Sequence, residues 1–310
     1  MGQVHLLINP AAGAGRAAKA HQQIIAAIEQ QGHQVTELRA DGPEHVASAI
    51  RQAQAQAQAK ASKMERLIIA GGDGLVHHAL PALAGSETVV GLVSAGTGND
   101  FARSLGLPTK IDSAVKAALS EPGQIDLVKS SPMGTESGVA DDGWVATVAT
   151  SGFSGQVNAA ANELRFPKGK QRYTIATLAN LPRLQSSDME VTVDGVTRNY
   201  RAALVAVANT RYFGGGMAIC PEARPHDGLV HLTIIEDVTS FTMARVLPTV
   251  FSGRHVKHPK VVVGRGTTVA VSGIHPFWAD GEQLGSQQSL TFSVCPKTLL
   301  VAGTSSLESA

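Results

Sequence analysis

The feature that most constrains the fold of this chain is an apolar run that ends in three glycines placed around one aspartate. Residues 67–74 read LIIAGGDG, and residues 75–83 continue with the apolar spacing of a helix. This pattern predicts a strand, a sharp turn and a helix. Glycines at the turn allow positive φ and leave no Cβ between the backbone and a ligand. The unpaired N–H groups at the start of the helix favour an anion.

Asp73 brings a negative charge into this predicted anion site. A carboxylate at that position would repel a phosphate unless a cation lay between the two groups. Gly71, Gly72, Asp73 and Gly74 together therefore indicate a phosphate ligand accompanied by a divalent metal ion.

Residues 1–130 alternate short apolar runs with segments of helical periodicity. This alternation predicts an α/β domain whose parallel sheet is covered by helices on both faces, as in Rossmann-like folds. Ligands of such sheets bind beyond the carboxyl ends of the strands, where the glycine turns are expected. The expected strands cover residues 4–8, 34–38, 67–70, 88–93 and 125–128, and clear helices cover residues 16–31, 75–83 and 112–119.

Residues 131–297 have a different residue pattern, in which short runs typical of β-strands dominate. They predict a mainly β domain, a sandwich, with helices over residues 173–184 and 241–251. The pair Asp194-Gly195 between two runs predicts a hairpin. The sequence leaves open whether residues 298–310 pack back on the first domain.

The composition fits a folded protein of about two domains. The 310 residues are 43% hydrophobic and 16% charged, and a net charge of +1 argues against nucleic-acid binding driven by bulk charge. Two cysteines far apart indicate a reducing compartment. No window approaches the ~20 apolar residues of a membrane span, and residues 1–10 lack the pattern of a signal peptide. We therefore expect a cytoplasmic protein whose membrane contact is peripheral.

Two further glycine turns follow expected strands. The turn over residues 9–15 is a weak match to the dinucleotide fingerprint, and no P-loop motif occurs. The turn over residues 96–100 reads GTGND, in which Thr97 adds a hydroxyl suited to a phosphate oxygen. Either turn alone could be no more than a tight turn, with Asp100 capping the next helix. The turns at 71–74 and 96–100, at adjacent strand ends, together favour phosphate binding.

Taken together, these motifs resemble the catalytic domain of the diacylglycerol kinase family. The resemblance implies a phosphofructokinase-like nucleotide fold for residues 1–130, and a lipid kinase that uses ATP and Mg²⁺, in the simplest case converting diacylglycerol to phosphatidic acid. It places ATP on the first domain and the acceptor lipid between the domains. The matching segments are NP at 9–10, GGDG at 71–74, GTGNDFAR at 96–103, IDL at 125–127, GF at 152–153, GGG at 214–216, PEA at 221–223, DGL at 227–229 and DGE at 280–282.

The resemblance also implies a role for individual residues. Glu282 would be the general base that accepts the lipid hydroxyl proton, and Asp73 and Asp280 would also be catalytic. The catalytic Mg²⁺ would lie near Asp73, held through the phosphates. The nucleotide would contact Asn9, Pro10, Gly13, Gly15, Thr36, Gly71, Gly72, Asp73, Gly74, Leu75, Val76, His77, Gly96, Thr97, Gly98 and Asn99.

A structural Mg²⁺ is implied at the carboxylate of Asp227 and the carbonyls of Arg224 and Leu229. From the residues alone, DGL at 227–229 also reads as a plain β-turn, and DGE at 280–282 as a hairpin turn.

The sequence departs from the family pattern after Asp73, because Leu75 replaces a usual Thr, and His77 and His78 replace a usual Asn-Glu pair.

Two other functions stay open: a kinase of the same superfamily that acts on NAD or a sugar, and an inactive nucleotide-binding module. Basic stretches at 166–172 and 254–260 are candidates for contact with the inner face of the membrane. Exposed edge strands of the β domain would permit a homodimer.

Overall fold

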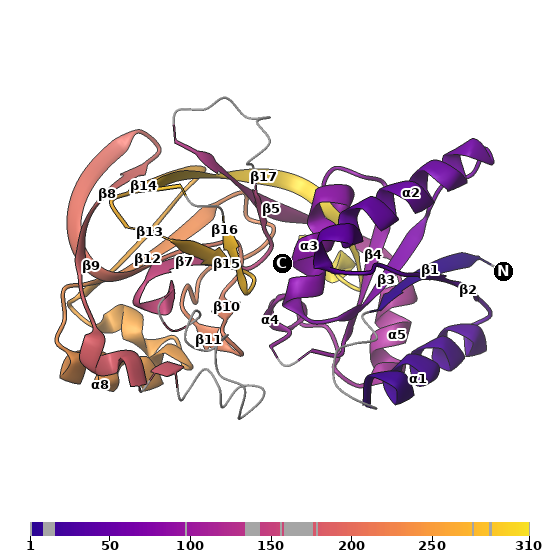
Figure 1. Ribbon diagram of the computed structural model, residues 1–310, viewed down its shortest axis with the longest axis horizontal. Coiled ribbons are helices and arrows are strands. Elements are labelled where there is room, and N and C mark those ends of the chain that lie inside the picture. Colours follow the sequence, from indigo (N-terminus) through magenta and orange to yellow (C-terminus); the bar gives the residue numbers. More distant parts are fainter. Residues whose placement is uncertain are drawn as a thin grey trace. The chain divides into compact units, whose positions relative to one another are not determined.

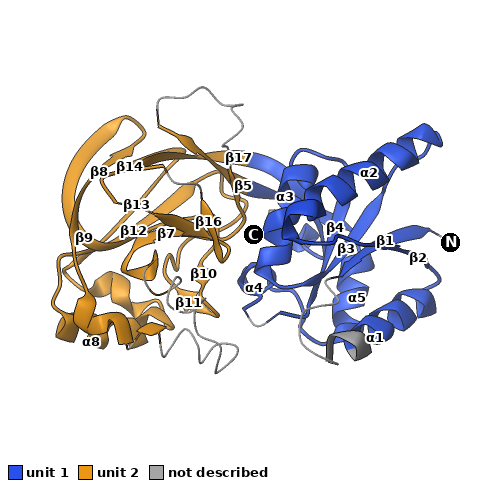
Figure 2. Ribbon diagram, viewed as in Figure 1, with its two compact units in different colours: residues 1–126, 296–310 blue, residues 127–295 orange. Residues whose placement is uncertain are grey.

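The structure, a computed structural model, describes residues 2–8, 16–96, 98–133, 143–155, 157, 176–177, 179–274, 276–284 and 287–309. The chain divides into two compact units (Figure 2). Unit 1 comprises residues 1–126 and 296–310, and unit 2 comprises residues 127–295.

Unit 1 is built on a parallel sheet with the strand order β2-β1-β3-β4. The last part of β17 (Ser289–Ala302) lies beside β4, where Val301 pairs with Val90. The predicted α/β architecture with a parallel sheet is therefore confirmed. The elements are β1 (Gln3–Ile8), α1 (Arg16–Gln30), β2 (Gln34–Leu38), η1 (Pro43–His45), α2 (Val46–Ala59), β3 (Arg66–Gly71), α3 (Asp73–Leu83), β4 (Val89–Ser94), α4 (Asp100–Ser104), α5 (Ile111–Leu119), the start of β5 (Pro122–Pro132) and η4 (Ser305–Ser309).

Helices cover both faces of this sheet, with α1 and α5 on one face and α2 and α3 on the other (Figure 1). Successive side chains of a strand point to opposite faces of the sheet, so each apolar strand can pack against the helices on both faces. Val4, Leu6 and Ile8 of β1 are buried in the same cluster as Ile24 and Ile28 of α1. Burial on both faces explains why β1, β3 and β4 read as continuous apolar runs.

Unit 2 is an antiparallel β-sandwich, as predicted. Helix α8 confirms the helix predicted at 241–251. Of the helix predicted at 173–184, residues 176, 177, 179 and 180 are helical and Leu181–Arg183 form the 3-10 helix η2, whereas residues 173–175 and 178 lie outside the described residues. The remaining elements are β6 (Gly143–Val145), β7 (Val148–Gly152), η2 (Leu181–Arg183), β8 (Ser187–Val193), β9 (Val196–Ala208), β10 (Tyr212–Phe213), β11 (Met217–Ala218), β12 (Val230–Glu236), α8 (Ser240–Val250), η3 (Arg254–Lys257), β13 (Val261–Gly266), β14 (Thr268–Ser272), β15 (Phe277–Ala279) and β16 (Glu282–Leu284).

Strand β9 separates two apolar clusters in unit 2. Val205 and Val207 point into the sandwich core, whereas Leu204 and Ala206 point into a second cluster that includes Met243 and Val250 of α8. Helix α8 therefore packs on the outer face of the sheet that contains β9.

Two tight hairpins of unit 2 have an Asp-Gly pair at the turn. Asp194 and Gly195 have φ angles of 45° and 83°, and Asp280 and Gly281 have 53° and 97°. Positive φ at both central residues is the mark of the type I′ turn, which matches the twist of the flanking strands. The hairpin predicted at 194–195 is confirmed by the pairing of Val193 with Val196.

Candidate functional site

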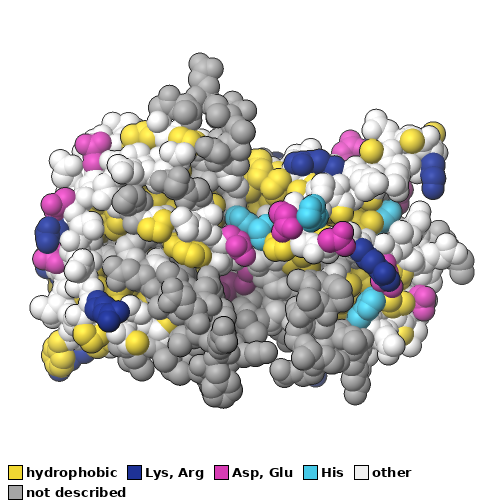
Figure 3. Space-filling model, in the orientation of Figure 1, with side chains coloured by type: hydrophobic (Ala, Val, Ile, Leu, Met, Phe, Trp, Pro, Cys, Tyr) yellow, Lys and Arg dark blue, Asp and Glu magenta, His cyan; other side chains and the backbone are white. Residues whose placement is uncertain are grey.

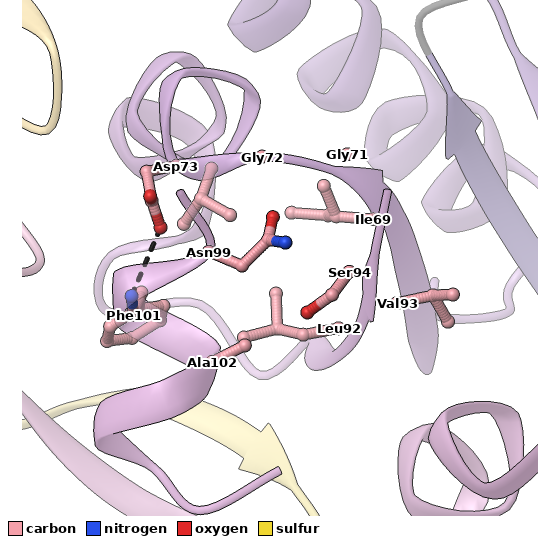
Figure 4. A pocket seen from close by; sticks show the side chains of 11 residues that line it. Ile69, Gly71, Gly72, Asp73, Leu92, Val93, Ser94, Asn99, Phe101 and Ala102 are labelled. Atoms are coloured by element: carbon pink, nitrogen blue, oxygen red, sulfur yellow. Dashed lines mark hydrogen bonds between the residues drawn. The ribbon is translucent and has the colours of Figure 1, made fainter. Parts of the chain in front are cut away.

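The turns after β3 and β4 lie against each other at the carboxyl edge of the unit 1 sheet (Figure 4). A Cβ added at Gly96 would lie 2.5 Å from the Cα of Gly72, and one added at Gly72 would lie 3.2 Å from the Cα of Gly96. Glycine is therefore needed here because two backbones approach closely, as well as for any ligand. The adjacency of the two turns is the arrangement that the sequence predicted.

Asp73 joins the two turns through its carboxylate. Its Oδ2 accepts a hydrogen bond from the backbone N–H of Asp100 at 3.0 Å, and its Oδ1 accepts one from the N–H of Phe101 at 3.1 Å. Figure 4 shows the second of these bonds. These N–H groups belong to the first turn of α4, so the helix end compensates part of the negative charge. The divalent metal ion expected near Asp73 stays a prediction.

Asn99 shapes the second turn. Its backbone is left-handed, with φ 56°, and its side-chain amide bonds to Gly96 twice: Oδ1 accepts from the Gly96 N–H at 3.2 Å, and Nδ2 donates to the Gly96 carbonyl at 2.9 Å. Asp100 is buried and forms a 2.5 Å ion pair with Arg103. The side chains of this turn therefore hold its backbone in place, and ligand contacts would come from backbone N–H groups.

The hollow beneath the two turns is small. Its volume of about 10 Å³ is enough for one water molecule. A nucleotide would therefore lie over the turns rather than inside this hollow.

The other residues expected to contact the nucleotide lie at different distances from the paired turns. Thr36 lies in β2, two strands away from β3, and its hydroxyl accepts a 2.8 Å hydrogen bond from Gln3. Leu75 packs on Gly71, where an added Cβ would lie 2.6 Å from a Leu75 methyl, so this departure from the family pattern fills space. Gly74, Val76 and His77 lie in the first turns of α3, and Gly98 lies against Asp73. Asn9, Pro10, Gly13, Gly15 and Thr97 lie outside the described residues.

The rings of His77 and His78 form an edge-to-face pair with centroids 5.5 Å apart. Both side chains are half-buried. The two rings therefore pack against each other on α3.

In unit 2 the candidate base Glu282 is the first residue of β16 and pairs with Ala279 across the type I′ turn. Asp280, within that turn, is buried. Its carboxylate accepts hydrogen bonds from the N–H groups of Ala146 and Thr147 at 3.1 and 2.9 Å, and from the Thr147 hydroxyl at 2.5 Å. These bonds hold the turn of the hairpin to which Glu282 belongs.

In the turn after Arg224, the carboxylate of Asp227 contacts two neighbouring residues. The N–H of Leu229 donates to Oδ1 at 3.0 Å, and Nε2 of His231 lies 2.8 Å from Oδ2. Within the described part of the chain, no three His, Cys, Asp or Glu side chains gather into a metal cluster. One carboxylate and neighbouring carbonyl oxygens are nonetheless hard donors of the kind that Mg²⁺ accepts together with water. Each carboxylate oxygen also retains lone pairs, so the donor chemistry fits Mg²⁺.

Unit 2 contains an apolar cavity that no sequence pattern predicted. Its volume is about 380 Å³, and it lies between β9, β12 and the face of α8 that includes Leu247. Strand β7, which pairs with β15 of the Glu282 hairpin, continues directly into Phe153 and Ser154 of the cavity wall. The wall is almost wholly hydrophobic, and its members include Phe153, Leu204, Phe213, Ile219, Leu247 and Phe251.

Burial disfavours the charged forms of Cys220 and His255, which pack behind this wall. Burial raises the pKa of the Cys220 thiol to about 12, against a smaller lowering effect of its hydrogen bond with Thr233. Burial also lowers the pKa of His255, against the opposing effect of its 2.9 Å hydrogen bond to the carbonyl of Ile219. The surroundings therefore favour an uncharged ligand.

The fold with its paired glycine turns defines a class of protein. A diacylglycerol kinase from Bacillus anthracis str. Sterne has a TM-score of 0.68 at 17% sequence identity, over 97% of this chain and 96% of that chain. Yeast NADH kinase in complex with NADH has a TM-score of 0.51 at 10% identity, over 97% and 83%. The chain thus has the two-domain fold shared by diacylglycerol kinases and NAD(H) kinases.

Sequence comparison narrows this class. The profile "Diacylglycerol kinase catalytic domain" matches residues 3–130, and "YegS C-terminal NAD kinase beta sandwich-like domain" matches residues 147–303. A "Diacylglycerol kinase" from Mycobacterium tuberculosis is 38% identical over 285 residues, which cover 91% of this chain and 89% of the relative. A "Probable lipid kinase YegS-like" from Cronobacter sakazakii is 30% identical over 233 residues, covering 72% and 73%. The chain belongs to the diacylglycerol kinase family.

Family membership places the protein among lipid kinases, which use a nucleotide. Among the described residues, no helix combines the length and the apolar character needed to span a bilayer.

Proposed function

We propose that this protein is an ATP- and Mg²⁺-dependent lipid kinase that transfers a phosphoryl group to the hydroxyl of diacylglycerol, giving phosphatidic acid. The observation that carries the proposal is the apolar cavity of about 380 Å³ in unit 2. This volume lies in the usual range of ligand pockets. A sugar or a nicotinamide dinucleotide would leave polar groups unpaired against this wall, whereas an acyl chain would not.

The donor side of the proposal rests on the paired turns of unit 1. Bound ATP would supply the γ-phosphoryl group, and Mg²⁺ would neutralise charge that develops during transfer. Backbone N–H groups of the two turns, other than that of Gly96, which donates to Asn99, would hold the phosphates. Asp73 would keep the two turns in register through its bonds to α4.

Glu282 would act on the acceptor. The lipid oxygen bonds to the γ-phosphorus, the bond from that phosphorus to the ADP oxygen breaks, and the hydroxyl proton passes to the Glu282 carboxylate. Asp280 would serve this step by holding the hairpin against Ala146 and Thr147.

The direct test is a transfer assay with purified protein, Mg²⁺, γ-labelled ATP and diacylglycerol in mixed micelles. The expected result is labelled phosphatidic acid. Label on NAD or a sugar, with none on any lipid, would favour the related kinase activity. Nucleotide binding without any transfer would mark an inactive module.

The cavity predicts a selective effect of Leu247→Trp. Leu247 lines the cavity, so the larger indole removes room for an acyl chain. Each methylene that no longer fits should raise KM for a long-chain acceptor about fourfold, with KM for a short-chain acceptor unchanged. Val196→Trp is the matched control, because Val196 is 61% exposed. Equal effects on both acceptors would show that acyl chains do not enter the cavity.

The proposed Mg²⁺ at Asp227 predicts a metal-dependent melting temperature. At a concentration ten times Kd, Mg²⁺ should stabilise the wild type by about 1.4 kcal/mol, and Asp227→Asn should abolish this increment. Thermal unfolding with Mg²⁺ and with EDTA measures it. Asp237→Asn is the control, since this exposed carboxylate lies outside the turn. If the Asp227→Asn variant keeps the full stabilisation by Mg²⁺, the metal binds elsewhere.

A further inference from the structure

Helix α8 of unit 2 has two stripes of different chemistry. Ala244, Leu247, Pro248 and Phe251 follow a spacing of three and four residues and line the apolar cavity. A second stripe, which contains Arg245, lines an open groove of about 390 Å³ on the other side of the helix. The same helix therefore borders both the cavity and the groove.

The groove is basic. Arg245 of α8 and Arg254 and Lys257 of η3 contribute three exposed cations to it. Residues 239–260, which form most of this region, contain no Asp or Glu. Within the part of the chain that the structure describes, none of the three cations has an acidic partner, whereas Lys260 beyond the groove pairs with Glu236 at 3.5 Å. The groove thus keeps its positive charge.

Exposed aromatic side chains lie at both ends of α8. Phe241 is 66% exposed and Phe251 is 59% exposed, which is unusual for residues of this size. The guanidinium of Arg245 stacks 4.2 Å from the centroid of the Phe241 ring. Hydrophobic and basic side chains lie next to each other at the lower left of Figure 3, where Figure 1 shows α8.

We infer that α8 and η3 form a docking surface for the surface of a bilayer that contains anionic phospholipid. The three cations would meet lipid phosphates, and Phe241 and Phe251 would enter the interface between headgroups and acyl chains. A soluble polyanion would satisfy the cations but would leave both phenylalanines in water. Since Phe251 also lines the apolar cavity, docking here would bring the cavity mouth to the bilayer.

Sedimentation with vesicles tests the charge component. The wild type should bind vesicles of phosphatidylcholine with phosphatidylglycerol, bind phosphatidylcholine alone much more weakly, and dissociate at high salt. Arg245→Gln with Arg254→Gln and Lys257→Gln should lower the partition coefficient on the order of 100-fold, since each cation near an anionic surface contributes about fivefold. The control combines Lys110→Gln, Lys116→Gln and Arg198→Gln, three exposed cations on other elements, and should bind like the wild type.

A second pair of variants tests the aromatic component. Phe241→Ala with Phe251→Ala should lower binding on the order of 10-fold. Val196→Ala with Met133→Ala, which truncates two other exposed hydrophobic side chains, should have no effect.

Three results would overturn the inference: no binding of the wild type to anionic vesicles, equal losses in the control variants, or a loss with the cations but none with the phenylalanines. The last result would show adsorption by charge alone, without entry of the phenylalanines into the bilayer, as expected of a surface that binds any polyanion. Sedimentation measures binding without turnover, so failure of this inference and failure of the proposed kinase activity are distinguishable.

Discussion

Replacement of Glu282 by Gln is expected to lower kcat by about 10²- to 10⁴-fold, the range that a positioned general base contributes. Gln keeps the size and hydrogen-bonding shape of the side chain but cannot accept the lipid hydroxyl proton. The hairpin should stay intact, because its turn is held by Asp280 and by the pairing of Ala279 with Glu282, neither of which needs the Glu282 carboxylate. ATP affinity and melting temperature should therefore change little.

Single-turnover kinetics with ATP and a micellar lipid acceptor would measure this loss, and titration with a fluorescent nucleotide would measure ATP binding. Glu190→Gln is the matched control, because Glu190 is exposed on another strand of the same unit. A loss of nucleotide affinity equal to the loss of turnover would assign Glu282 to binding. Near-normal turnover would remove it from the reaction.

Replacement of Gly96 by Ala is expected to raise the apparent KM for ATP on the order of 100-fold, since a shift of about 1 Å in a positioning group can have an effect of this size. The added methyl group would lie 2.5 Å from the Cα of Gly72 and 2.9 Å from Oδ1 of Asn99, so the two turns must move apart. Overpacking of this kind also destabilises a fold by about 1–3 kcal/mol.

Gly264→Ala provides the control for this variant. A Cβ at Gly264 would have its nearest neighbour, a side-chain atom of Leu232, at 3.7 Å, which is ordinary van der Waals contact. Thermal unfolding separates a loss of fold from a loss of nucleotide affinity. A Gly96 variant with normal KM for ATP would show that the nucleotide does not rest on the paired turns.

Much of unit 1 could be predicted from local sequence patterns. The apolar runs, the helical spacing after them and the glycines between them lie within a few residues of one another, so each strand, turn and helix is readable by itself. The parallel order of β3 and β4 then places the turns at 71–74 and 96–100 side by side. The local pattern did not reveal that the N–H groups of Asp100 and Phe101 bond to the Asp73 carboxylate, because these groups become neighbours only in the folded chain.

The sequence by itself thus determined the alternation of strands and helices, the adjacent glycine turns, the sandwich and the family resemblance. Only the tertiary structure decided that Asp280 holds the Glu282 hairpin, and that unit 2 contains an apolar cavity beside a basic groove. The cavity wall draws on residues from Phe153 to Phe251, which no local period connects. Such a site depends on long-range packing around β9 and α8, where side chains distant in the sequence become neighbours.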